Sequence, residues 1–134
     1  MTYHARGTFE VKTTPVAMDE QAQAATLGRF TLDKQFHGDL EGTSKGEMLT
    51  AGRVEGSAGY VAIERVNGTL HGRAGSFALQ HTGSMAPGAL QLTITVVPDT
   101  GTGELAGLAG QMTIDFSGGG HTYDLEYKFG DAGG

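Results

Sequence analysis

The chain of 134 residues has no cysteine, no tryptophan and only 3 prolines. Without cysteine no disulfide can form, so the fold has to be held by its core. No apolar run approaches the roughly 20 residues of a membrane-spanning helix, and the first residues lack the basic and then apolar order of a signal peptide. We therefore expect a cytoplasmic protein that is not embedded in a membrane.

Positive charge is also scarce. The chain has 9 lysines and arginines against 15 aspartates and glutamates, for a formal net charge of -6, and the basic residues are interspersed with the acidic ones. Proteins that bind nucleic acid usually carry a basic patch or stripe that contacts phosphates. Nucleic acid is therefore not an expected partner.

Glycine, in contrast, is abundant, with 23 residues, and aromatic and β-branched residues are spread along the chain. A disordered chain would be poor in aromatic and β-branched residues, so we interpret the glycines as turns and bulges. A chain of this length can bury roughly two-thirds of its unfolded surface around one core. We expect residues 1–134 to form a single domain.

Alternation of apolar and polar residues dominates the sequence, as expected for strands with one buried face. Such faces are formed by Tyr3, Ala5, Phe9 and Val11, by Phe30, Leu32 and Phe36, by residues 90–96, by Met112, Ile114 and Phe116, and by Tyr123, Leu125, Tyr127 and Phe129. Turn sequences such as Gly38-Asp39 and Asn67-Gly68 separate these segments. Residues 19–25 form a loop that could hold one short helix.

The count gives about eight strands joined mostly by hairpins, with no helix long enough to cover an open sheet. Closure of the sheet on itself removes its exposed edges. The predicted fold class is therefore all-β, a single closed antiparallel barrel of about eight strands. The interior of such a barrel is either filled by side chains or able to hold one small ligand.

Four segments carry a resemblance to a known family: Phe36–Ser44, Gly59–Val66, Gly75–His81 and Gly101–Gly110. They resemble small bacterial barrel proteins of uncharacterised function, related in architecture to the allene oxide cyclase and dirigent barrels. The resemblance covers most of the chain from about Gly28 to Phe129. It implies an allene-oxide-cyclase-like barrel that binds an apolar or amphipathic small molecule, and it implies no catalytic residues.

Two glycine motifs look catalytic but are better explained by strands. Gly101, Gly103 and Gly107 are spaced one residue too widely for the dinucleotide fingerprint, and a strand pattern follows them. The segment Gly42–Gly46 spells G-x-S-x-G, but no helix follows it either. We therefore expect Ser44 to be a solvent-facing serine of a strand rather than a nucleophile.

The five histidines are spread along the chain: His4, His37, His71, His81 and His121. No two of them have the i,i+2 or i,i+4 spacing that would place two ligands on one face, and no acidic neighbour completes a metal site. We expect no metal and no cofactor.

Two polar residues interrupt apolar faces. Lys34 shares the face of Phe30, Leu32 and Phe36, and His81 shares that of Phe77 and Leu79. Each is a candidate for an interior polar group. Alternatively, Lys34 reaches water from a strand end, and His81 bonds a neighbour in the core or at the rim.

The inward face of the strand around residues 57–66 can be assigned in two ways. With a two-residue turn at Asn67-Gly68, Glu64 lies opposite His71, and the lumen carries Tyr60, Glu64, His71, Arg73 and His81. A bulge at Gly72 or Gly75 instead brings Val61 and Ile63 inward, with Arg65 in place of Glu64. Without the bulge, an exposed apolar patch favours a homo-oligomer, and its members are Val61, Ile63 and Leu70.

A carboxylate and an imidazole in a partly dry lumen have perturbed pKa values, which suits general acid–base chemistry. We expect a barrel that binds one small apolar or amphipathic molecule, oriented by residues among Lys34, Tyr60, Glu64 and His81. The alternative is a cofactor-free isomerase or cyclase that holds a flexible substrate in a reactive conformation. A third hypothesis is an inert barrel whose outer surface matters. The sequence leaves open whether the protein is an enzyme.

Overall fold

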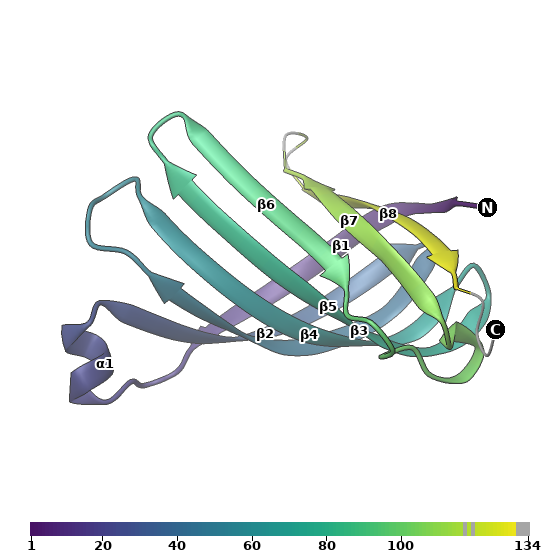
Figure 1. Ribbon diagram of the computed structural model, residues 1–134, viewed down its shortest axis with the longest axis horizontal. Coiled ribbons are helices and arrows are strands. Elements are labelled where there is room, and N and C mark those ends of the chain that lie inside the picture. Colours follow the sequence, from purple (N-terminus) through teal and green to yellow (C-terminus); the bar gives the residue numbers. More distant parts are fainter. Residues whose placement is uncertain (117, 119, 131–134) are drawn as a thin grey trace.

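The computed structural model describes residues 1–116, 118 and 120–130. Eight antiparallel strands pair in chain order and close into a barrel (Figure 1). The strands are β1 (Tyr3–Pro15), β2 (Leu27–Gly38), β3 (Leu40–Ala51), β4 (Ala58–Leu70), β5 (Arg73–Ala86), β6 (Ala89–Val96), β7 (Leu108–Asp115) and β8 (His121–Phe129). This architecture confirms the predicted all-β barrel.

The two ends of the barrel differ. At one end, here called the closed end, lie Asp39, the β4–β5 turn and the loop 97–107, which contains the 3-10 turn η1 (Gly103–Leu105). The opposite end, here called the open end, carries the loop 52–57 between β3 and β4 and the turn 87–88 between β5 and β6. The helix α1 (Glu20–Ala24) also lies there, at the left of Figure 1. Asp19 begins α1 by accepting a hydrogen bond from the Ala22 N–H at 2.8 Å, so the loop predicted at residues 19–25 does hold one short helix.

Apolar side chains fill the lumen toward the closed end. The alternating pattern of each strand turns these side chains inward, and the following are at most 1% exposed: Phe36, Leu40, Leu70, Phe77, Leu79, Ile94 and Leu125. Full burial of one such side chain contributes about 1.5–3 kcal/mol. This half of the lumen is therefore a packed core, and a ligand inside the barrel would have to lie nearer the open end.

The β4–β5 turn does not lie at Asn67-Gly68, so that prediction is wrong. The turn is His71-Gly72, where both residues have positive φ angles of 47° and 81°. Positive φ at both central residues is the geometry of a type I′ hairpin turn. Gly68 lies within β4 opposite Gly42, and a Cβ added to Gly68 would come 2.7 Å from the Gly42 Cα. Close approach of the two strands, rather than a turn, accounts for glycine at position 68.

The shifted turn changes the predicted faces. Glu64 pairs with Leu79 rather than with His71, and it points inward without a bulge. Val61 and Ile63 are 51% and 57% exposed, as predicted for this register. Leu70, in contrast, is fully buried, because β4 continues through it with the same alternation. The expected patch therefore loses one of its three members.

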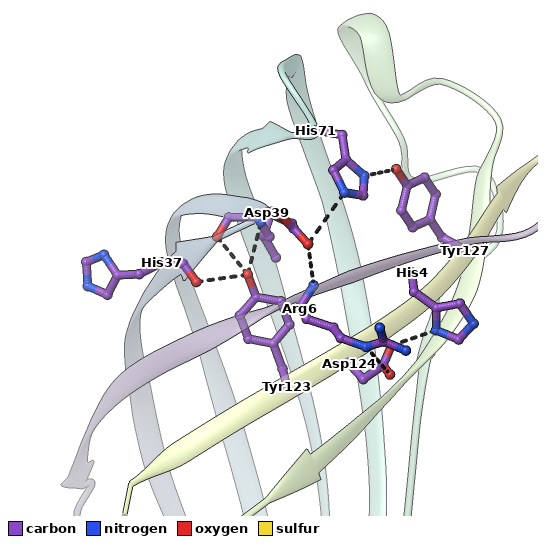
Figure 2. A network of polar contacts seen from close by, with 9 residues as sticks. His4, Arg6, His37, Asp39, His71, Tyr123, Asp124 and Tyr127 are labelled. Carbon is purple, nitrogen blue, oxygen red and sulfur yellow. Dashed lines mark hydrogen bonds and ion pairs between the residues drawn. The ribbon is translucent and has the colours of Figure 1, made fainter.

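His71 and Arg73 lie at the closed end and not in the lumen with Glu64, which corrects the group proposed from the sequence. The His71 Nδ1 is hydrogen-bonded to the Tyr127 hydroxyl, and its Nε2 lies 3.5 Å from an Asp39 carboxylate oxygen (Figure 2). The Arg73 guanidinium stacks over the Phe129 ring at 4.7 Å. Both residues tie the β4–β5 turn to β8.

Further polar contacts join β1 and β8 at this end (Figure 2). His4 and Arg6 contact the two Asp124 carboxylate oxygens at 2.8 and 2.9 Å, and Asp39 accepts the Arg6 backbone N–H at 2.9 Å. The Tyr123 hydroxyl accepts the buried Leu40 N–H at 2.9 Å. Histidines and acids that could have suggested a site are thus used in holding the closed end together.

Candidate functional site

Four polar side chains from neighbouring strands meet inside the barrel around the carboxylate of Glu64, and we call them the Glu64 cluster. Lys34 Nζ on β2 lies 2.7 Å from Oε2 of Glu64, and His81 Nε2 on β5 lies 2.6 Å from the same oxygen. The Ser44 hydroxyl on β3 donates to Oε1 at 2.8 Å. Glu64 on β4 therefore accepts three hydrogen bonds.

Strand register brings these residues together. Lys34 pairs with Ser44 across β2 and β3. On β5, His81 lies two residues beyond Leu79, the cross-strand partner of Glu64, and therefore on the same inward face as Glu64. Gly46 is the cross-strand partner of Glu64, and a Cβ at Gly46 would lie 2.7 Å from the Glu64 Cβ. The absence of a side chain at position 46 therefore leaves space for the Glu64 side chain.

The Glu64 cluster is buried, and the positive charge of Lys34 balances the negative charge of Glu64. Glu64 is 0% exposed, and Lys34 and His81 are 5% and 4% exposed. The Lys34 ammonium also lies over the rings of Phe9 and Phe36, at 5.1 and 5.8 Å from their centroids. Such cation–π contacts help to compensate a desolvated ammonium.

Glu64 remains ionised despite its burial. Desolvation raises the pKa of its carboxyl, but the hydrogen bond from His81 and the charge of Lys34 outweigh that effect and lower the pKa to about 2. A carboxylate accepts hydrogen bonds and does not donate them, so Nε2 of His81 carries the shared proton. Glu64 thereby fixes the orientation and the tautomer of the imidazole.

The second nitrogen of His81 is available. No described residue bonds Nδ1, whereas every fully buried side-chain nitrogen or oxygen in the described part of the chain has a partner. Nδ1 therefore keeps some solvent-accessible surface, although His81 as a whole is only 4% exposed. In the neutral imidazole this atom has a lone pair that can accept a hydrogen bond or a proton.

Tyr60 lies next to His81 toward the open end. The centroids of the two rings are 6.4 Å apart. The Tyr60 ring lies against Gly83, its cross-strand partner, at a place where a Cβ would clash. Burial, and then the negative charge of Glu64, raise the pKa of the Tyr60 phenol, so its hydroxyl keeps its proton.

The interior becomes accessible beyond His81. Inward-facing side chains at the open end are partly exposed: Tyr60 and Met48 are half-buried, and Met85 and Leu90 are 49% and 64% exposed. Solvent therefore reaches between the strands here. The Glu64 cluster separates this apolar, accessible region from the packed core.

A second surface lies outside the barrel. A groove of about 1040 Å³ runs between α1 with its preceding loop and the outer faces of β2 to β5. Leu49, Val61 and Ile63 give it an apolar floor, and Arg29 pairs with Glu47 beside it at 2.5 Å. This groove competes with the open end as a place for a small molecule.

The structure brings together the four residues predicted to line the lumen, which are Lys34, Tyr60, Glu64 and His81. Ser44 belongs with them, so the prediction of a solvent-facing serine is wrong: Ser44 is 1% exposed. The turn predicted at Gly38-Asp39 did not reveal this position of Ser44. A two-residue turn there would place Thr43 opposite Lys34, whereas the observed pairing is shifted by one residue and places Ser44 there, on the same inward face.

The described residues contain no group of three or more His, Asp and Glu side chains placed to hold a metal ion. Neither of the short helical segments among them is long and apolar enough to cross a membrane.

Comparison with known proteins identifies the family of this chain. A crystal structure of a protein of unknown function from Shewanella oneidensis MR-1, assigned to the DUF3224 family, is 47% identical to this chain. The match covers 97% of this chain and 99% of that one, with a TM-score of 0.89. No curated protein matches the chain. The model of DUF3224, described as a protein of unknown function, matches residues 5–127. The chain belongs to the DUF3224 family.

Proposed function

We propose that the protein binds one small amphipathic molecule at the open end of the barrel, with the polar group of the molecule against His81 and Tyr60. The observation that carries this proposal is the His81 imidazole. A buried carboxylate holds one of its nitrogens at 2.6 Å, and its other nitrogen has no partner among the described residues and keeps some accessible surface. Buried ionisable groups held in this way are enriched at functional sites.

The stability of the barrel does not by itself require such a cluster. Desolvation of an ion pair often costs as much as the attraction returns, and apolar residues of similar volume serve a core equally well. The strands carry apolar side chains at most other inward positions toward the closed end. A polar floor below an apolar, accessible region is instead the arrangement that orients a ligand.

The chemistry of the floor indicates the polar group of the ligand. Nδ1 of neutral His81 accepts a hydrogen bond, and the protonated Tyr60 hydroxyl can donate or accept one. A hydroxyl group of the ligand would satisfy both residues. Its apolar part would contact Met48, Met85 and Leu90, which leave apolar surface exposed.

A titration with 1-naphthol tests this site, because that probe combines a hydroxyl group with an apolar body. We expect binding to the wild type, followed by fluorescence, and at least a tenfold weaker affinity for His81→Leu, which is about 1.4 kcal/mol. The control is Ile63→Gln, which alters the outer groove and should leave the affinity unchanged. Loss of binding in Ile63→Gln with wild-type affinity in His81→Leu would place the ligand outside the barrel and refute the proposal.

A second candidate function is cofactor-free isomerisation at the same place. It is favoured by the pairing of a carboxylate-held imidazole, a possible general base, with a protonated phenol 6.4 Å away between ring centroids, a possible general acid. Such a pair could remove a proton beside a carbonyl group and return it at another carbon. No metal or organic cofactor takes part in that step.

Deuterium incorporation measures this activity. In D2O, the wild type should catalyse exchange of the α-protons of small apolar ketones, such as 1-tetralone, and His81→Leu should lose the exchange. Tyr60→Phe should slow it by about 10²-fold or more, the usual contribution of a positioned general acid. Equal exchange rates with and without the protein would leave binding alone as the function.

A further inference from the structure

The seam between β6 and β7 is the weakest in the barrel. Only two residue pairs join these strands, Ile94 with Met112 and Thr95 with Gln111, whereas β4 and β5 are joined by thirteen. In Figure 1 the ribbons of β6 and β7 lie farther apart than those of β5 and β6. On the β7 side, the segment Leu90–Thr93 therefore pairs with no described residue and presents a free strand edge.

A second free edge lies opposite, on β1, and it is protected. Beyond Phe9 the strand β1 pairs only with β2, and this stretch carries the charged residues Glu10 and Lys12 and ends at Pro15. Charges and proline are the usual means by which proteins prevent edge-to-edge pairing. The free edge of β6 has none of them, because residues 89–93 read Ala-Leu-Gln-Leu-Thr.

We propose that β6 of one copy of this chain pairs antiparallel with β6 of a second copy, about a twofold axis at Gln91. In this register Gln91 faces its own counterpart, and Leu90 of each copy faces Leu92 of the other. Leu90 is 64% exposed and its cross-strand neighbour Met85 is 49% exposed. Pairing covers the apolar side chains of both copies and satisfies the free backbone groups of both edges.

A second copy fits this edge better than a foreign peptide, because the edge is complementary to itself. Residues 89–93 carry no charge, and their polar and apolar residues alternate. Rotation about a twofold axis at Gln91 places leucine opposite leucine. A charged peptide could form no ion pair with residues 89–93, whichever the sign of its charge. The pairing itself requires no ligand: it involves neither His81 nor Tyr60 and shares only Met85 and Leu90 with the proposed ligand site.

Charge exchange at the twofold axis tests the pairing. We expect the wild type to sediment at twice the mass of the chain. Gln91→Lys alone and Gln91→Glu alone should each raise the dimer dissociation constant at least about tenfold, because like charges then face each other directly. An equimolar mixture of the two variants should dimerise again. Thr43→Lys, on a strand paired along both edges, is the matched control and should remain dimeric.

A disulfide provides a second readout, because the chain has no cysteine of its own. Facing residues of an antiparallel pair have Cα atoms about 4.5–5.5 Å apart, within the range that a disulfide bridges. Gln91→Cys should therefore oxidise to a covalent dimer, and Thr43→Cys should not. A monomeric wild type, or dimers that persist in both single charge variants, would overturn the proposal. In the former case the edge would be free for an extended segment of another protein.

Discussion

Replacement of Glu64 by alanine is expected to lower the free energy of unfolding by about 3–5 kcal/mol, the usual cost of removing one partner from a buried ion pair. The substitution leaves the Lys34 ammonium and the His81 imidazole 5% and 4% exposed, without the carboxylate that both of them contact. It also removes the acceptor of the Ser44 hydroxyl. Urea denaturation followed by circular dichroism at pH 7 measures the loss.

The matched control is Glu47→Ala on the neighbouring strand β3. Glu47 also forms an ion pair, with Arg29, but its side chain is 56% exposed. An exposed pair contributes about 1 kcal/mol or less. If the two variants lost the same small amount of stability, the Glu64 cluster would not be the desolvated network that its burial indicates.

The barrel itself was predictable because alternation is a local property. Phe30, Leu32 and Phe36 define the inward face of β2, independently of its register with the neighbouring strands. Lys34 has the same parity and therefore also points inward. The same argument placed His81 beside Phe77 and Leu79. The parity of a strand therefore gave two of the four cluster residues without any knowledge of register.

Register was harder to predict, because two glycine-containing dipeptides competed for one turn. Asn67-Gly68 has the stronger turn sequence, but Gly68 is needed where β4 approaches Gly42 of β3, a contact between residues far apart in sequence. His71-Gly72 then forms the turn, with a histidine at positive φ. A single sequence does not reveal which glycine serves a turn and which serves a close contact.

The filling of the lumen could not be predicted for a similar reason. The volume inside a barrel depends on strand tilt and stagger, which no residue pattern states. Here the side chains of β1 to β8 fill the half toward the closed end, and partly exposed side chains such as Met85 mark the other half. A ligand inside the barrel would thereby be restricted to the region between His81 and the open end.

The stability of the protein is expected to fall in acid in a way that depends on Glu64. Its pKa is about 2 in the folded protein, compared with an ordinary value of 4.5. A carboxyl whose folded pKa is depressed stabilises the fold above its unfolded pKa, and this contribution is lost as the pH falls from about 4.5 to about 2. A shift of this size corresponds to about 3 kcal/mol.

Comparison with Glu64→Gln isolates this effect, because the amide has a similar shape and does not titrate. Other groups contribute to the acid sensitivity of the wild type. For Asp124, burial raises the pKa, but the hydrogen bonds from His4 and Arg6 and the charge of Arg6 together outweigh it and lower the pKa. Such contributions are common to both proteins and cancel in the difference between them. We therefore expect urea titrations to show a wild-type advantage at pH 6 that shrinks by about 3 kcal/mol toward pH 2.

Parallel stability curves for the wild type and Glu64→Gln would carry a wider consequence. They would mean that Glu64 has the same proton affinity in the folded and unfolded chains, so that the folded barrel does not favour the carboxylate. His81 would then lack the anionic acceptor that assigns the proton to Nε2 and leaves the Nδ1 lone pair toward the open end. The acid titration thus tests the electrostatic basis of the proposed ligand binding and of the proposed proton transfer in one measurement, before any ligand has been identified.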